Sequence, residues 1–569
     1  MKKLINYKIL VLTTLFFSCQ SELEEGFINP ESTNPPKEDL FGGMFTSMMY
    51  EWKIYVQDYG EWWWQMSGNG IPSYSQVAVR YITPRYGWYT DYDDLVNGLG
   101  LDDSAIRGFF DDYYKRMKNY GLMRDELGAM SEEEKAEVET FFHLATVVKD
   151  YGALKLVDLY NSIPYSEALR GTEAVFFPKF DDPEEVYKSI LDELKMIGEI
   201  LPASYGKMSE DAKSKLQVQD FAFHGDIDKW QRYINSLRIK FALRMSAVDE
   251  AFAGTHIQDA FDKGVPEEDL TWPLPFENNV LSGGTWTRGL YERAFVTFIP
   301  NIIMKRMNFN ELTYEEGMDD PRLPVIAMPT KHGDYRGASM NADAQDAPYK
   351  AGETYYPYAD DITASLEQNA LSMYNHATYT HNEFPVYMMS RAELDLCLAE
   401  AVMKGLVTTG KTAGAHLHDA VVNSTDFWYN ISALSSYESG VAVLHPQRPS
   451  DALVAAYADQ VETAFNSQSG LENQMEVLMQ QKYIHLNLMH PYELFAELRR
   501  TRHPRLEPMT FQGKVMAPTP ERIRYPTSSL ATNAENYATV KDQDNFDTPI
   551  FWVPESKQNE SYYRDGYDY

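Results

Sequence analysis

Apolar residues at helical spacing, introduced by helix-capping residues, are the sequence feature that most limits how this chain can fold. Asp182 offers a capping carboxylate and Pro183 a favourable first helical residue, and Val186, Ile190 and Leu194 then recur every four residues. This spacing puts one apolar stripe on a helix, and such a stripe has to pack against another element. The segment therefore predicts a helix that belongs to a larger helical core.

Similar patterns recur along most of the sequence. Ser131 precedes Glu134 by three residues, which is the spacing of a capping box ahead of an apolar helix face. Apolar periodicity predicts further helices over residues 226–247, 387–407, 474–488 and 491–500. Strands are predicted to be few and short. The expected fold class is therefore mainly α.

Long segments without a helical pattern separate these helices, at about residues 57–105, 271–385 and 505–569. They are rich in Gly, Pro, Asn, Asp, Tyr and Trp. Structureless segments of this length in a compact protein usually have a function. We expect a helical scaffold whose long irregular loops form one aromatic-rich face.

One of these segments contains the stretch EWWWQMSGNG, residues 61–70, with three of the chain's 10 Trp side by side. A helix fans three neighbouring side chains over much of its surface, and a strand sends Trp62 and Trp64 to one face and Trp63 to the other. Neither geometry buries all three rings in one core. An exposed aromatic patch is therefore expected here, and such patches usually bind something.

The charge balance narrows the class of ligand. The 569 residues include 51 Lys and Arg against 84 Asp and Glu, a formal net charge of −33. A surface this acidic repels phosphate backbones, which argues against nucleic acid as a partner. It also disfavours peripheral docking on an anionic leaflet. A neutral ligand suits the chain better.

The first 19 residues resemble an export signal. A short apolar run over residues 9–17 is preceded by Lys2, Lys3 and Lys8. Cys19 follows this run directly after Ser18. The run is too short to cross a bilayer, so residues 1–18 are predicted to be a signal peptide of the lipoprotein type, with Cys19 as the lipidated residue. The alternative is an ordinary signal peptide with an incidental Cys. The mature chain is expected to contact the membrane through its lipid anchor only.

The other cysteine, Cys397, lies in an apolar run and is predicted to be a small buried hydrophobic residue. With Cys19 lipidated, no disulfide is available. Two cysteines cannot build a cysteine-based zinc site or a redox motif.

Several segments together resemble motifs of the SusD/RagB family of surface nutrient-binding lipoproteins. Residues 158–169, DLYNSIPYSEAL, are similar to that family's D-x-Y-G-x-(I/V)-P-Y-S-E-A-L turn, with Asn161 in place of the usual Gly. Both residue types tolerate a positive φ. Further resemblances follow in chain order at 180–187, 220–238, 320–323, 392–401 and 481–533, and the whole spans about residues 19–552.

This resemblance implies a single helical domain over residues 19–569, with tetratricopeptide-like helix pairs and insertions at about 57–105 and 271–385. It implies a cell-surface lipoprotein of the outer membrane that caps a SusC-like TonB-dependent transporter. Glycans are the commonest ligands of the family, while its RagB branch handles peptides. The family is not enzymatic, so no catalytic residue and no cofactor is expected. Glu22, Glu24 and Glu25 resemble the surface-export signal of such lipoproteins.

The candidate ligand-binding residues are aromatic rings with neighbouring polar groups. Pyranose C–H bonds pack on ring faces, while amides and charged groups align the hydroxyls. The resemblance implies that binding aromatics come from an N-terminal loop and from the segment after residues 235–238. The candidates in these two regions are Trp62, Trp63, Trp64, Asn69, Arg85, Trp88, Trp286, Arg288 and Tyr291.

A secreted glycan hydrolase is the alternative from another functional class, and peptide capture is the alternative among binding proteins. The pairs 102–103 and 111–112 are adjacent carboxylates, whose side chains diverge in a helix, whereas glycosidase carboxylates face each other. No G-x-S-x-G motif is present. His416 and His418 could hold a metal only from a strand, and residues 91–98 lack the Gly and Glu of a calcium loop. No metal site is predicted, and a structural Ca²⁺ elsewhere is left open.

Overall fold

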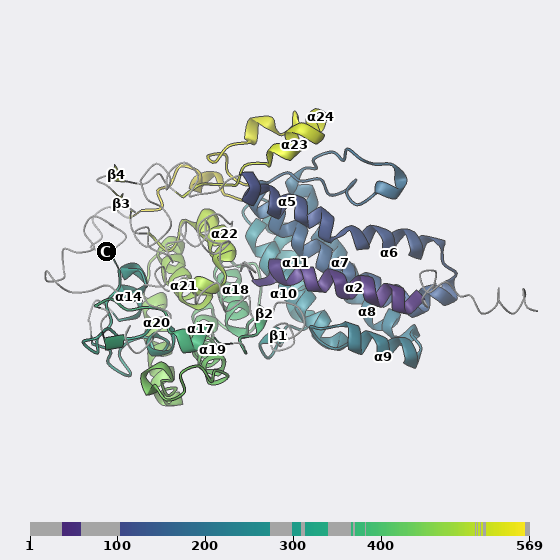
Figure 1. Cartoon of the computed structure of the whole chain (residues 1–569). Helices are drawn as coiled ribbons and strands as arrows, with labels where there is room; N and C mark the ends of the chain where they lie inside the picture. Colours follow the sequence, from purple (N-terminus) through teal and green to yellow (C-terminus); the bar gives the residue numbers. More distant parts are fainter. Residues whose placement is uncertain are drawn as a thin grey trace, which may run out of the picture.

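The chain is mainly helical, as predicted, throughout the part that the structure describes. This computed structural model describes residues 37–57, 103–272, 299–308, 313–338, 366–367, 370–379, 381, 383–506, 508, 510–511, 514–515 and 519–563. Two groups of helices account for most of it, one from each half of the sequence. Figure 1 shows them beside each other, with the N-terminal half in purple to teal and the C-terminal half in green.

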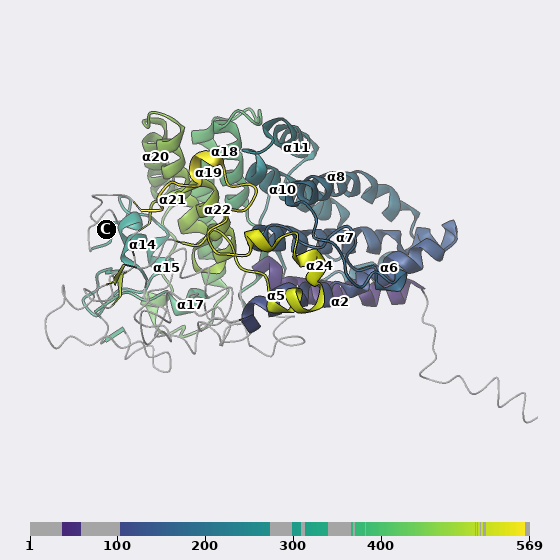
Figure 2. The ribbon, with the colours of Figure 1, turned by 90° about the horizontal axis from the view of Figure 1, so that it is seen from above.

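The first group is a stack of helix pairs of the tetratricopeptide-like type. Helix α7 packs between α2 and α8, and α8 in turn packs on α10, which packs on α11. Figure 2 shows these helices lying alongside one another in layers. The members of this group are α2 (Lys37–Gln57), α5 (Asp103–Arg116), α6 (Lys118–Ala129), α7 (Glu132–Tyr160), α8 (Pro183–Lys207), α9 (Glu210–Gln219), α10 (Ile227–Met245) and α11 (Glu250–Lys263).

The second group is built in the same way from the later part of the chain. Helix α19 packs on both α18 and α20, and α21 contacts α18, α20 and α22. The two groups meet where α10 packs on α18. The main members are α18 (Arg391–Met403), α19 (Ala413–Ala433), α20 (Asp451–Asn466), α21 (Leu471–Leu486) and α22 (Pro491–Thr501). Short helices accompany them: α14 (Asn301–Met307), α15 (Leu323–Ile326) and α17 (His376–Tyr379). Two further short helices near the C-terminus, α23 (Thr527–Thr532) and α24 (Ala534–Tyr537), lie against the first group, where α23 contacts α5 (Figure 1).

The strands in the described residues are short and form two antiparallel pairs. Strand β1 (Leu270–Trp272) pairs with β2 (Val386–Met389), with Thr271 opposite Tyr387. Strand β3 (Thr510–Phe511) pairs with β4 (Lys514–Val515). Since β2 also packs against α2 and α10, the β1–β2 pair lies at the border between the two helix groups (Figure 1).

The predicted helix starts at the two clearest caps are confirmed. The Ser131 hydroxyl accepts from the backbone N–H of Glu134 at 3.3 Å, and the Glu134 carboxylate accepts from the Ser131 N–H at 2.9 Å, so the capping box is complete. The Asp182 carboxylate accepts from two N–H groups of the first turn of α8, and Pro183 is its first residue. The helices predicted from residues 226 and 491 are also present, as α10 and α22.

The prediction of a helix over residues 387–407 was wrong at its start. Val386–Met389 forms strand β2, because this stretch of β-branched, aromatic and apolar residues finds a partner in β1. The helix begins at Arg391, where the Ser390 hydroxyl accepts from the Glu393 N–H at 3.0 Å. It ends at Met403, shortly before Gly405 adopts a positive φ of 74°.

Helices α19 and α20 were missed from the sequence, although α19 carries a recognisable start. The Thr412 hydroxyl accepts from the Ala415 N–H at 3.1 Å, and Leu417 and Val421 then face the core. The His416-Leu417-His418 motif lies on this helix, so the strand on which a metal site was considered does not exist there. The predicted helix over 474–488 is present as α21, with bounds Leu471–Leu486.

A buried carboxylate organises the turn between α9 and α10. Asp220, which is fully buried, accepts from the indole N–H of Trp230 at 2.7 Å and from the Gly225 N–H at 2.9 Å. Its other oxygen accepts from the N–H groups of Ala222 and Phe223 at 3.1 and 3.2 Å. One side chain thus satisfies four donors that would otherwise be buried without a partner.

We predict that Asp220→Ala lowers the free energy of unfolding by about 3–5 kcal/mol, because four donors lose their acceptor in a buried turn. Chemical denaturation followed by tryptophan fluorescence measures the change. Asp182→Ala is the matched control, because it removes an exposed helix cap and should cost only about 1 kcal/mol. Equal losses for the two variants would contradict the assigned role of Asp220.

Candidate functional site

The candidate ligand-binding residues lie outside the described part of the chain. This holds for all nine of them and for Cys19, so their roles stay predictions: Trp62, Trp63, Trp64, Asn69, Arg85, Trp88, Trp286, Arg288 and Tyr291. The structure does describe the chain on both sides of the two segments that contain them. The elements that flank these two segments form the frame of the site.

The segment before residue 103 is framed by α2 and α5. Lys37, at the start of α2, pairs with Glu126 near the end of α6 at 2.7 Å. Helix α2 also packs on β2, and its other end, at Gln57, points toward the second helix group (Figure 1). The first half of α5 also reaches that group: Phe109 packs edge-on against Tyr492 of α22, with ring centroids 5.6 Å apart. Both flanks of this segment thus meet the border between the groups.

The segment 273–298 has an equally well-defined frame. It follows β1, which is paired with β2, and the described chain resumes after it at Ile299. The Ile299 N–H donates to the Ser372 carbonyl at 3.0 Å, and its carbonyl accepts from the Ala338 N–H at 2.7 Å. Gly337 lies so close to Asn301 that an added Cβ would come within 2.3 Å of the Asn301 Cα, which leaves room only for glycine. Three segments distant in sequence are fixed together here.

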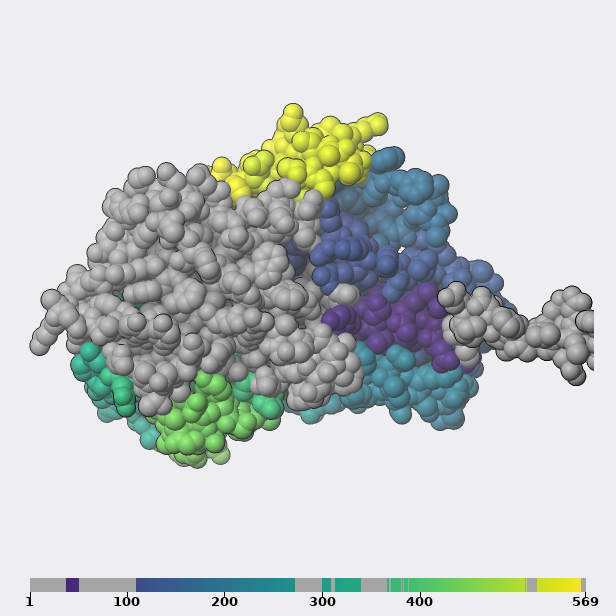
Figure 3. Space-filling model, viewed as in Figure 1, coloured from purple at the N-terminus to yellow at the C-terminus, as the bar shows by residue number. Residues whose placement is uncertain are grey.

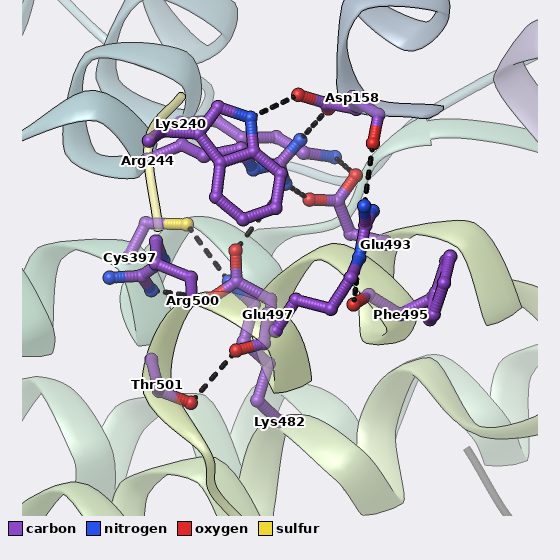
Figure 4. A network of polar contacts seen from close by, with 12 residues as sticks. Asp158, Lys240, Arg244, Cys397, Lys482, Glu493, Phe495, Glu497, Arg500 and Thr501 are labelled. Carbon is purple, nitrogen blue, oxygen red and sulfur yellow. Dashed lines mark hydrogen bonds and ion pairs between the residues drawn. The ribbon is translucent and has the colours of Figure 1, made fainter. Parts of the chain in front are cut away.

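The border that supports these flanks holds a buried network of ion pairs (Figure 4). The Lys240 ammonium of α10 lies 2.8 Å from both Glu393 of α18 and Glu493 of α22. Glu493 also contacts Arg244 of α10 and lies 3.6 Å from Lys155 of α7. One carboxylate therefore connects α22 to two helices of the first group.

Arg244 extends the network to the end of α7. Its guanidinium contacts the Asp158 carboxylate and lies 3.3 Å from Glu497. Asp158 also accepts from the indole N–H of Trp552 at 2.9 Å and from the Tyr187 hydroxyl. Asp158 is thereby connected to α8, α10 and the C-terminal part of the chain.

Arg500 of α22 closes the network on the side of α18. It donates to both oxygens of Glu400, at 2.5 and 2.7 Å, and to Glu497 at 2.5 Å. Lys482 of α21 lies 3.3 Å from Glu497 and 3.8 Å from the thiol of Cys397. Helices α7, α10, α18, α21 and α22 thus each contribute at least one charged group.

The fully buried charges of this network balance, and the partly exposed Lys404 also pairs with Glu400 at 2.7 Å. Five buried cations meet five buried anions: Lys155, Lys240, Arg244, Lys482 and Arg500 with Asp158, Glu393, Glu400, Glu493 and Glu497. Burial is the largest single effect on Glu393 and raises its pKa, but Lys240, His490 and Lys482 together outweigh it and hold that pKa at about 2. Burial likewise raises the pKa of Glu400, and Arg500 with Lys404 lowers it to about 2. These carboxylates are therefore charged and committed to the scaffold.

Asn161, next to the network, confirms the expectation of a positive φ at that position. Its φ is 69°, directly after the end of α7. Its side chain accepts from the Phe551 N–H at 2.8 Å and donates to Gln543 at 2.7 Å. The position that differs from the usual Gly is thus used to fasten the C-terminal part of the chain.

Of the groups considered for catalysis or metal binding, those that the structure describes make other contacts, while the pair 102–103 and residues 91–98 lie outside the described side chains. Asp111 accepts from the Ser528 hydroxyl at 3.1 Å, and Asp112 pairs with Arg116 at 3.3 Å. His416 is bonded to Thr409 at 2.7 Å. Over the described ranges, no group of three or more His, Cys, Asp or Glu side chains could hold a metal ion.

Other features of the border fit a packed scaffold. Cys397 is buried, as predicted, and burial raises the pKa of its thiol. A cavity of about 10 Å³ lies between α21, α22 and the chain at Pro504, which is room for one water molecule and far too little for a sugar. Within the part of the chain that the structure covers, no helix has the length and apolar character to cross a membrane.

The comparison with known families decides the class of the chain. The profile of a SusD-like family, described as starch-binding and associating with the outer membrane, matches residues 73–526. The chain belongs to the SusD-like family. Among curated proteins, none gives a significant match.

Solved structures of the SusD-like fold cover nearly the whole chain. A chitin-binding protein superposes with a TM-score of 0.63 at 20% identity, covering 90% of this chain and 99% of that one. A chitin-binding SusD homologue from Flavobacterium johnsoniae gives 0.61 at 18% identity, with coverages of 91% and 99%. A SusD homologue from Bacteroides fragilis gives 0.61 at 17% identity, with coverages of 90% and 99%.

Membership settles two points about this SusD-like protein. SusD-like proteins are outer-membrane nutrient-binding proteins and not enzymes, so the hydrolase alternative is wrong. The motifs that carried the resemblance are mostly scaffold residues: Asp158, Asp220, Glu493 and Arg500 all make the buried contacts described above. Sequence reasoning found these residues but did not identify the buried partners to which they bond.

We predict that Arg500→Met lowers the free energy of unfolding by about 3–5 kcal/mol, because it leaves Glu400 and Glu497 buried with fewer cations. Urea denaturation measures the loss. Lys135→Met removes a cation from an exposed pair with Glu132 at 2.8 Å and should cost at most about 1 kcal/mol. A loss for Arg500→Met as small as that of the control would show that the network does not stabilise the border.

The depressed pKa values of Glu393 and Glu400 predict the direction of acid denaturation. Both fall from an ordinary value of 4.5 to about 2, so their contribution to stability is complete above pH 4.5 and is lost as the pH falls toward 2. Urea unfolding at a series of pH values should show this decline. Glu400→Gln should be less stable near neutral pH and should show a shallower decline below pH 4.5. An unchanged slope would contradict the assignment.

Proposed function

We propose that this SusD-like protein captures an oligosaccharide at the cell surface and passes it to a SusC-like TonB-dependent transporter. The observation that carries the proposal is the common frame of its two aromatic-rich segments. Three of their four flanks lie at the border between the helix groups: α2 and α5 for the first segment and β1 for the second. This arrangement supports a ligand site to which both segments contribute.

A glycan is the ligand that these residues suit best. Indole and phenol rings offer flat apolar faces for pyranose rings, and Asn69, Arg85 and Arg288 add hydrogen-bonding groups. The family is described as starch-binding, and two of the similar structures are described as chitin-binding. The net charge of −33 is no obstacle to a neutral sugar.

The anchor completes the proposal. Residues 1–18 would be removed on export, and Cys19 would carry the lipid that holds the protein at the outer membrane. Membership in a family that associates with the outer membrane supports this location.

We predict that replacing Trp64, Trp88 and Trp286 by Ala together abolishes glycan binding, because each change removes a ring face. A glycan array that includes chitin and malto-oligosaccharides, with a peptide library alongside, identifies the ligand. Isothermal titration of the best ligand then compares the wild type with the triple variant. The thermal unfolding of the two proteins should coincide, since a ring that faces the ligand contributes little to the buried core.

Three results would count against this proposal. Unchanged titration of the triple variant would exclude these rings from the site. Binding to peptides in place of sugars would favour a RagB-type protein. Release of shortened products from a polysaccharide would contradict a purely binding role.

A further inference from the structure

The connection between α7 and α8 presents two aromatic side chains to solvent. Phe176 and Phe177 are 68% and 65% exposed, and Leu530 on the nearby helix α23 is 52% exposed. We call residues 164–181 the Phe loop. Large apolar side chains at such exposure, next to each other in sequence, are typical of an interaction site.

The Phe loop is fastened at its base. The Tyr165 hydroxyl donates to Asp150 at 2.8 Å and accepts from Lys149 at 3.0 Å. The Asp181 N–H donates to the Ile163 carbonyl, and its carboxylate accepts from the Tyr165 N–H, both at 2.9 Å. The two ends of the loop are therefore joined to each other and to the middle of α7.

The Phe loop is also fastened along both sides. Arg124 of α6 donates to the Leu169 carbonyl at 3.2 Å, and Thr172 bonds to Asp125. On the other side, Asn536 of α24 donates to the Phe177 carbonyl at 2.9 Å. Contacts on both sides hold the two phenylalanines in a fixed place, and such preorganisation favours binding.

Helix α23 adds apolar surface to the same place. Asn533, the residue that follows α23, donates to the Pro178 carbonyl at 2.7 Å. Leu530 lies on α23 three residues before Asn533, so its exposed side chain is on the element that this bond joins to the Phe loop. Figure 3 shows the C-terminal residues, in yellow, lying against the blue residues of the first half at one edge of the molecule.

The charged groups around the Phe loop are paired with one another. Arg170 lies 2.7 Å from Glu173, and Lys179 lies 3.3 Å from Asp181. Arg124 lies 2.9 Å from Asp125 and 3.3 Å from Glu173. Glu167 accepts from the Lys179 N–H. Three cations thus face four anions, and the surroundings are close to neutral on a chain of net charge −33.

These surroundings discriminate among the classes of occupant. A loop that inserts into an anionic lipid surface needs a surplus of Lys or Arg, and here there is none. A sugar needs hydrogen-bonding groups beside the ring, but Arg170, Thr172 and Asn536 are already bonded within the protein. A second copy of the chain would bring another charge of −33. A protein with an apolar socket fits best.

We propose that the Phe loop, with Leu530, is a docking surface for the SusC-like transporter, with Phe176 and Phe177 inserted into an apolar socket on its extracellular side. This inference depends on the proposed function, because it names the surface by which that partner is engaged. Aromatic side chains buried in a partner's pocket commonly dominate the affinity of an interface.

The test uses the full mature protein and its cognate transporter, identified by a gene adjacent to that of this chain and purified in detergent. Bio-layer interferometry measures the Kd for the wild type and for a variant with Phe176→Ser and Phe177→Ser. We expect the Kd to rise by at least about tenfold. The matched control is Val218→Ser with Leu471→Ser, two apolar residues that are 72% and 55% exposed elsewhere, and its Kd should not change.

Other readouts separate the possible failures. Glycan affinity and thermal unfolding should be the same for the Phe variant and the wild type. If the Phe variant binds the transporter as tightly as the wild type, the docking surface is overturned and the proposed function is not. If the wild type does not bind the transporter, the docking surface and the proposed function are both overturned. If the wild type but not the Phe variant binds transporter-free lipid vesicles, the loop is a membrane contact. If the wild type but not the Phe variant dimerises in analytical ultracentrifugation, the loop contacts a second copy of the chain.

Discussion

The buried ion pairs between the two helix groups are the interaction on which the rest of the structure depends. Ten charged side chains from α7, α10, α18, α21 and α22 meet there in balanced numbers. Removing charged groups from water costs free energy, and the attraction between the ions offsets this cost only when every partner is in place. The network therefore favours one arrangement of the two groups, since a shift of either would leave charges buried without partners.

The frame of the proposed ligand site is supported by this border. Strand β2 packs on α10, α2 packs on β2, and α5 reaches α22 through Phe109 and Tyr492. The same helices carry the motif residues of the SusD-like family, so what identifies the family in this sequence is chiefly its scaffold. The fold is shared with chitin-binding SusD homologues at about 20% identity.

The local parts of the fold were predictable because their physics is local. Ser131 with Glu134 and Asp182 with Pro183 mark helix starts through bonds within one turn, and both were confirmed. Residues 387–389 of strand β2 were predicted to be helical, because their partner β1 is more than a hundred residues away in the sequence. Helix α19 was overlooked although Thr412 caps it. For the candidate site, sequence reasoning named residues and family chemistry, and the structure contributed the frame around them.

The sequence by itself determined the class of this protein: a mainly helical SusD-like chain, acidic, with aromatic residues concentrated in a few irregular segments. Capping, periodicity and ordered motifs suffice for that, because each is a property of neighbouring residues. Only the tertiary structure decided that Asp158, Arg244, Glu493 and Arg500 form one network, and that Phe176 and Phe177 are held exposed between α6 and α24. Charge pairing and exposure depend on which distant segments meet, and that is set by packing.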